Sequence, residues 1–399
     1  MTPVGLIGIL ISLAGFHFAR AGESRARLVL FVLLLLTHIG ASLAYYLYAQ
    51  EFGGDVLLYY YDQWGIYHEG HSGLSTVFVI NFVQFLKEYL GGAFFDYFLI
   101  FQAMGFWGIL FVLRTFDDIH GELGQPLFSR IYLLLFLPGL HFWTSAIGTD
   151  APVCLGVAMC TWAAFRLQKR YLVFGAGLAI ALVIRPHITL IALVALAFTV
   201  LVGRNTRLLT RVALLGVTVV GVVSVAGLVS SSFNGLNLSN TDEVSEFLET
   251  KSSVSEDSGG DVSITGAAFP VKLLSLLFRP FFIDATGMLG YIASLENVVL
   301  LIIILTLFRR FGTSLQVARG AMFARFAFIF FAMLTLLLAM VNYNVGLGLR
   351  QKMMMMPCLL AFFVALLAVR AARRQAAVYD PRAAAYAGGP LGVPGYRSV

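Results

Sequence analysis

The chain has 399 residues, of which 59% are hydrophobic and only 12% are charged, and its mean hydropathy is +0.86. This composition excludes an ordinary soluble domain and predicts an all-α, polytopic transmembrane protein. The formal charge of +6 does not indicate nucleic-acid binding, because the basic residues separate apolar runs and form no soluble basic face.

Apolar runs bounded by charged or turn-rich breaks predict about eleven spans. Several runs are shorter than the ~20 residues that a straight span needs, so we expect tilted or re-entrant segments among them. The runs cover residues 4–19, 28–49, 93–113, 128–147, 151–165, 171–184, 187–202, 209–229, 290–308, 321–341 and 353–369. They form one predicted membrane domain, residues 1–374. A disordered cytoplasmic tail rich in Ala, Gly and Pro is predicted to follow at 375–399.

The positions of Lys and Arg predict the orientation of the chain. Alternate breaks hold most of the 27 basic residues, and cytoplasmic loops are the ones that carry such an excess. This places the N-terminus outside and the C-terminus in the cytoplasm. A polar loop at 230–266 then lies outside, either as a lid or as a plain hydrophilic loop.

The outer segment 51–92 combines carboxylates, tyrosines and histidines without being apolar enough to cross a bilayer. If it is helical, Asp55, Tyr59 and Asp62 share one face, because four and seven residues are close to whole helical turns. This face is a candidate working surface. The alternative is an amphipathic interfacial segment whose acids simply face water.

Five basic residues lie at outer span ends, against the general pattern. A membrane-edge Arg costs on the order of 3 kcal/mol unless it is paired, so such residues are functional hypotheses. A guanidinium also suits phosphate, since its planar fork donates two hydrogen bonds to adjacent oxygens. The alternative is that Arg185 and Arg279 form structural ion pairs with Asp150, Asp284 or Glu296. The five are Arg185, Lys272, Arg279, Arg350 and Lys352.

Other candidates are ambiguous at the level of pattern. Asp150 precedes a predicted span and fits a helix N-cap, which we favour, or a site carboxylate. His141 and Trp143 suit the binding of a sugar ring or an ordinary membrane interface, and His187 follows Arg185 and Pro186. No metal site is predicted, because the spacing of His68 and His71 and the three apolar-run cysteines match no metal motif.

Several motifs together resemble those of bacterial polytopic proteins from exopolysaccharide and O-antigen gene clusters. They are GGDVLLYYYDQW, LPGLHFWTSAIGTDA, VIRPHI, LLFRPFF with SLENVVLL, and NYNVGLGLRQKMMMMP, within about residues 50–360. Such proteins are similar to GT-C type glycosyltransferases and to repeat-unit polymerases. The chain departs from the GT-C pattern because its acidic outer loop follows the second predicted span and lacks an adjacent pair of acids.

The resemblance implies a bacterial inner-membrane enzyme whose substrate is a sugar on undecaprenyl phosphate or diphosphate, with chemistry on the outer face. It implies that Asp55 or Asp62 activates an acceptor hydroxyl, and that Arg185, Arg279 and Arg350 hold the lipid diphosphate. A divalent cation between Asp55 and phosphate is compatible with this scheme but not required.

The expected partners are the polyprenyl-linked sugar, membrane lipids and other polysaccharide-assembly proteins, with no nucleic acid. The rival interpretations are a flippase for the same lipid-linked sugar and a structural subunit of an export complex.

Overall fold

The computed structural model describes residues 2–19, 25–62, 74–123, 129–203, short stretches between 211 and 224, 267–341 and 345–379. Within these ranges every regular element is a helix and no β-strand occurs, which confirms the all-α prediction. Six helices there are long and apolar enough to cross a membrane, so the membrane character is also supported, whereas the count of about eleven spans is not confirmed. The six are α2 (Arg25–Phe52), α6 (Phe94–Glu122), α9 (Leu167–Ile184), α14 (Gly287–Arg309), α16 (Met322–Val341) and α18 (Met356–Tyr379).

Other apolar helices are shorter than a straight span. They are α1 (Pro3–Ala19), α8 (Asp150–Phe165), α10 (Pro186–Val202) and α13 (Phe269–Phe278). About half of the predicted run 209–229 and all of the predicted loop 230–266 lie outside the described residues. Because α18 continues to Tyr379, the first residues of the predicted tail are helical, and 380–399 are not described.

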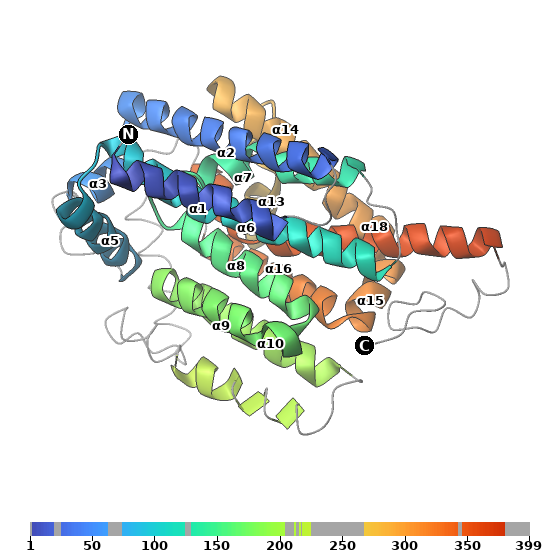
Figure 1. Cartoon of the computed structure of the whole chain (residues 1–399). Coiled ribbons are helices and arrows are strands. Elements are labelled where there is room, and N and C mark those ends of the chain that lie inside the picture. Colours follow the sequence, from blue (N-terminus) through green and yellow to red (C-terminus); the bar gives the residue numbers. More distant parts are fainter. Residues whose placement is uncertain are drawn as a thin grey trace.

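Helix α6 is the centre of the bundle, with α1, α2 and α8 packed around it (Figure 1). Its buried face includes large rings such as Phe98, Phe106 and Phe116. Gly105 permits the closest approach, since a Cβ atom there would lie 1.9 Å from the carbonyl oxygen of Thr144. By contrast, large apolar side chains on α2 and α14, such as Leu36 and Ile302, are exposed, as expected of lipid-facing positions.

The predicted span 128–147 is not one helix. It consists of the 3-10 helix η1 (Ser129–Phe136), the short helix α7 (Pro138–Trp143) and a non-helical stretch up to Asp150. Pro138 lacks a backbone N–H and so begins a new helix. The irregular backbone is buried among other helices, where its polar groups find partners: the Ser42 hydroxyl, for example, donates to the Ser145 carbonyl at 2.9 Å.

The outer segment also differs from its predicted pattern. Helix α3 (Asp55–Tyr61) carries Asp55 and Tyr59, but it ends at Asp62, whose φ of 56° is left-handed. Asp62 is exposed and leaves the face that it was predicted to share with Asp55 and Tyr59. A second helix, α5 (Leu74–Leu90), lies beside α3 near the N-terminus (Figure 1). Helix α17 (Val345–Gln351) and the 3-10 helix η3 (Lys352–Met354) precede α18 in the chain.

Candidate functional site

Four charged residues from distant parts of the chain meet near the ends of helices, and we call them the Asp55 cluster: Asp55, Asp150, Arg185 and Arg350. The Arg350 guanidinium lies at its centre, with Nη1 donating to Asp55 Oδ2 at 2.7 Å and Nε donating to Asp150 Oδ2. Arg185 Nη2 lies 3.4 Å from Asp150 Oδ1. Asp150 is therefore shared by two guanidinium groups, and the structure brings together four residues predicted from sequence.

The local sequence explains how Arg185 reaches this cluster. Pro186 occupies the first turn of α10 and interrupts the helical path, so Arg185 takes a non-helical conformation between α9 and α10. Its side chain reaches the start of α8, where Nη2 also donates to the Thr149 hydroxyl at 2.9 Å. Thr149 is the N-cap of α8 but makes no side-chain cap bond, so the α8 N-terminus is organised around Arg185.

Asp150 does not act as the N-cap that we favoured. It is the first residue of α8, and both of its carboxylate oxygens accept from arginines. A buried carboxylate requires such partners, because an unpaired charge in the interior costs several kcal/mol.

The electrostatics of the Asp55 cluster differ between its two arginines. Burial lowers the pKa of Arg350, but Asp150 and Asp55 outweigh burial and raise it well above its ordinary value. For Arg185 the balance is reversed, because burial outweighs the attraction of Asp150 and lowers its pKa. Tyr59 is buried beside these charges, and burial raises its pKa to about 12, so it stays a neutral phenol. Arg350 is thus the firmly held cation and Arg185 the less satisfied one.

Two groups of the cluster keep unused hydrogen-bonding capacity in the described part of the chain. Among the described residues, all hydrogen bonds of Arg185 come from Nη2, so its Nε and Nη1 hydrogens are available to a ligand. Asp55 Oδ1 accepts no hydrogen bond from described residues, and the Asp55 side chain is 40% exposed. The cluster therefore presents a carboxylate oxygen and guanidinium donors that make no hydrogen bond to the described residues.

Aromatic rings surround the cluster. Tyr45 of α2 lies 5.8 Å from Trp143 and 4.6 Å from Phe142, measured between ring centroids. Tyr45 is close enough to Arg350, Asp55 and Asp150 to interact with their charges. Trp143, which is half-buried and lies against Tyr45, offers a ring on which a sugar can stack.

The remaining predicted residues lie elsewhere or make other contacts. Arg279 pairs locally with Asp284 at 2.5 Å, as the ion-pair alternative proposed, and within the described ranges it makes no ion pair with the Asp55 cluster. His187 is half-buried next to Arg185 on α10. His68 and His71 are outside the described residues.

His141 is fully buried and forms a pair with His38. The two Nδ1 atoms are 3.0 Å apart, and His141 Nε2 lies 2.7 Å from the Leu135 carbonyl oxygen. A carbonyl only accepts, so His141 carries its hydrogen on Nε2, and in the neutral pair His38 donates to His141 Nδ1. His141 is therefore engaged inside the bundle and not exposed at an interface.

Buried ionisable residues inside apolar runs include His38 in LLLLTHIG, which was not singled out from the sequence, and Glu296 in SLENVVLL, which was named only as an ion-pair partner. An ionisable residue in such a run is itself a signal of a functional or paired group. Lys352, which was predicted, lies fully buried near Glu296.

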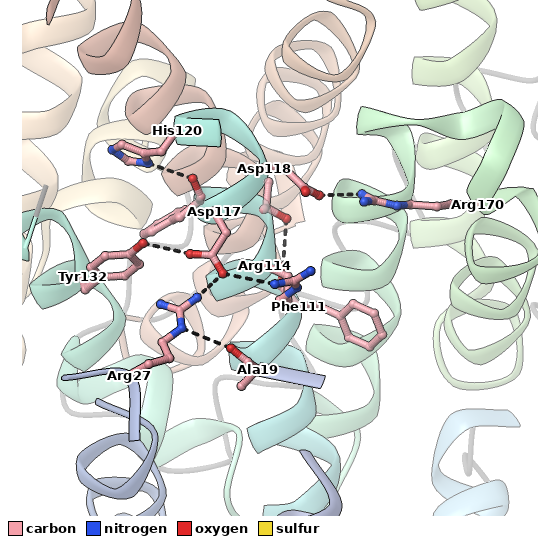
Figure 2. Close-up of polar contacts among 11 residues, drawn as sticks. Ala19, Arg27, Phe111, Arg114, Asp117, Asp118, His120, Tyr132 and Arg170 are labelled. Carbon is pink, nitrogen blue, oxygen red and sulfur yellow. Dashed lines mark hydrogen bonds and ion pairs between the residues drawn. The ribbon is translucent and has the colours of Figure 1, made fainter. Parts of the chain in front are cut away.

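A second polar network connects helices near the C-terminal end of α6 (Figure 2). Asp117 accepts from Arg27, from Tyr132 at 2.8 Å, and lies 3.6 Å from Arg114. Its neighbour Asp118 accepts from Arg170 at 2.6 Å, and Arg170 in turn lies 3.7 Å above the Trp162 ring. Both carboxylates pair with arginines of neighbouring helices, and Asp117 also accepts from Tyr132 of η1. We therefore interpret this network as a structural connection between α2, α6, η1 and α9.

Comparison with known proteins adds no relative: no family model, no curated protein and no solved structure matches the chain. Within the described residues, no group of three or more His, Cys, Asp or Glu is arranged to hold a metal ion. Fold and site together define an α-helical membrane protein with a half-buried, charge-balanced cluster that is most open at Asp55.

Proposed function

We propose that the chain is a membrane glycosyltransferase or polysaccharide polymerase that uses a sugar linked to undecaprenyl phosphate or diphosphate. The observation that carries this proposal is the shared position of a half-open carboxylate and two guanidinium groups in the Asp55 cluster. Transfer from a lipid diphosphate needs a base beside the acceptor hydroxyl and positive charge where the leaving phosphate gains negative charge. Asp55 and the arginines match those two requirements.

The roles divide according to the contacts. Asp55 Oδ1, which accepts no hydrogen bond from described residues and belongs to a partly exposed side chain, takes the proton of the acceptor hydroxyl. Arg185, whose Nε and Nη1 are unused, binds the phosphate oxygens, while Arg350 holds both carboxylates in place. Tyr59 and Trp143 border the sugar-binding side, and a divalent cation between Asp55 and phosphate remains compatible with this division.

The proposal includes a location and an orientation. The chain lies in a bacterial inner membrane with about eleven spans. Its N-terminus is periplasmic and its C-terminus cytoplasmic, so that the Asp55 cluster faces outwards. Other polysaccharide-assembly proteins are its expected partners. Labelling of a cysteine placed at Ser252 tests the orientation, and cytoplasmic labelling contradicts it.

The alternative is a flippase for the same lipid-linked sugar, or a structural subunit of an export complex. The buried His38 and His141 pair favours the flippase, because ionisable groups inside spans are common in transporters. One experiment separates the candidates: purified protein in proteoliposomes receives the lipid-linked repeat unit in one leaflet. Chain extension supports the enzyme, movement without extension supports the flippase, and neither supports a structural subunit.

A further inference from the structure

Glu296 and Lys352 are buried near one another without forming an ion pair. Glu296 is 4% exposed and Lys352 is 0% exposed. Attraction to Lys352 is among the effects on Glu296, yet their charged atoms lie beyond the 4.0 Å of a salt bridge. Buried opposite charges normally close such a gap, because their attraction compensates for lost hydration.

Glu296 and Lys352 each form one hydrogen bond to a polar neighbour among the described residues. Glu296 Oε2 accepts from the Gly139 N–H at 2.5 Å, while Oε1 has no hydrogen-bond partner. Lys352 Nζ donates to Asn297 Oδ1, which uses one of its three N–H groups. The Asn297 amide donates to the Pro280 carbonyl at 2.7 Å, so its orientation is fixed as well.

Gly139 is what allows the carboxylate to sit against α7. A Cβ atom at this position would lie 2.7 Å and 2.9 Å from the two oxygens of Glu296. Any other residue would push the carboxylate away, so the unpaired Oε1 belongs to a carboxylate held by close backbone contact.

The chemistry of this arrangement selects its ligand. A carboxylate oxygen accepts a hydrogen bond, whereas an ammonium group donates one. A group that binds both must donate and accept at once. An anion is repelled by Glu296 and a cation by Lys352, so a neutral group that both donates and accepts, such as the hydroxyl of water or of a saccharide, suits the pair.

The pair also adjoins the Asp55 cluster. Lys352 follows Arg350 by two residues, and α7 lies beside α14, α17 and η3. Helix α7 carries Gly139 at one end, against Glu296, and Trp143 at the other, against Tyr45.

We propose that Glu296 and Lys352 form a subsite that binds one hydroxyl of a saccharide whose lipid phosphate lies at the Asp55 cluster. This proposal rests on the proposed function. The hydroxyl donates to Glu296 Oε1 and accepts from Lys352 Nζ.

The test is a binding comparison in nanodiscs with two probes: undecaprenyl diphosphate, and the lipid-linked repeat unit extracted from cells that make the protein. Wild-type protein binds the sugar-bearing lipid more tightly. Glu296→Gln and Lys352→Met each lose about ten- to hundred-fold in affinity for that lipid, the size of a hydrogen bond to a charged group, and leave affinity for the bare lipid unchanged. Glu122→Gln, on an ion pair at the other end of α6, is the matched control and changes neither.

The outcomes separate the two levels of the proposal. If wild-type protein binds neither lipid, the proposed function fails. If it binds both and the two substitutions leave the preference for sugar intact, water occupies the pair and the subsite is overturned, while the Asp55 cluster stands. Gln at 296 keeps the size of the side chain and an acceptor for Gly139. Should it still fail to fold, Lys352→Met decides alone.

Discussion

Arg350 and Asp55 are 295 positions apart in the chain, yet Nη1 of the arginine lies 2.7 Å from Oδ2 of the aspartate. The contact joins α17 to α3. Because the same guanidinium also holds Asp150, one side chain connects three segments of the bundle and fixes the direction of the free Asp55 oxygen.

The first prediction concerns Arg350→Lys. Lysine keeps the charge but lacks the planar fork that reaches two carboxylates at once. We expect polymer formation to fall at least ten-fold with unchanged protein levels in the membrane. Polymer length and amount measured in cells that carry only the variant test this, and wild-type polymer contradicts a bridging role for Arg350.

The second prediction separates the two carboxylates by stability. Asp150 is buried between two arginines, so Asp150→Asn lowers the free energy of unfolding by about 3–5 kcal/mol. Asp55 is far more exposed, so Asp55→Asn costs at most about 1 kcal/mol. Thermal unfolding in detergent compares them, and equal losses contradict the assignment of Asp150 as the inner carboxylate.

The third prediction concerns Arg185→Gln. The change removes the guanidinium with unused donors, so binding of undecaprenyl diphosphate weakens by about ten- to hundred-fold. Arg279→Gln is the matched comparison, because Arg279 pairs locally with Asp284 and is expected to change the affinity little. Titration of both variants with the lipid in nanodiscs gives the result, and equal affinities would assign Arg185 to structure alone.

A fourth prediction tests the structural connection shown in Figure 2. Asp117→Asn removes the carboxylate shared by Arg27, Arg114 and Tyr132, so we expect a loss of about 3–5 kcal/mol in unfolding free energy. Glu122→Gln breaks only the more exposed pair with Arg166 and costs less than about 1 kcal/mol. Similar melting temperatures for both variants contradict the structural importance of Asp117.

A fifth prediction is a pH dependence. Burial lowers the pKa of Lys352 from 10.5 to about 8. Between these values the unfolded chain binds more protons than the folded one, so this lysine makes stability rise with pH from about 8 to about 10.5. Melting temperatures of wild-type protein and Lys352→Met are compared across this window. The wild type gains stability relative to the variant as pH rises, and parallel curves contradict a lowered pKa.

Periodicity and apolar length predicted most of the long helices because each depends on its own stretch of sequence. The prediction of one helix over 128–147 was wrong because Pro138 begins a new helix and the backbone after Trp143 is not helical. Polar groups of that buried backbone find hydrogen-bond partners on other segments, such as Ser42 on α2. Asp62 misled for a local reason: it adopts a left-handed conformation that ends α3 one residue too early for the expected face.

The Asp55 cluster could be predicted as a set of residue types but not as a geometry. Arg185 and Arg350 lie on the predicted outer side, whereas most basic residues lie on the cytoplasmic side, and this difference could be recognised from the sequence. The carboxylate that each arginine contacts could not be predicted from the sequence, because the partners come from separate helices. The pairing of His38 with His141 and the approach of Glu296 to Gly139 depend on the same long-range packing.

The central claim is that Asp55 acts as the base of a sugar transfer held in place by Arg350. The most direct measurement incubates purified wild-type protein and Asp55→Asn with undecaprenyl-diphosphate-linked repeat unit and follows glycan length by mass spectrometry. We predict lipid-linked products longer than one repeat for the wild type and a rate lower by about 10²- to 10⁴-fold for the variant. Equal extension by both proteins, or no extension by folded wild-type protein that binds the lipid, would contradict the claim.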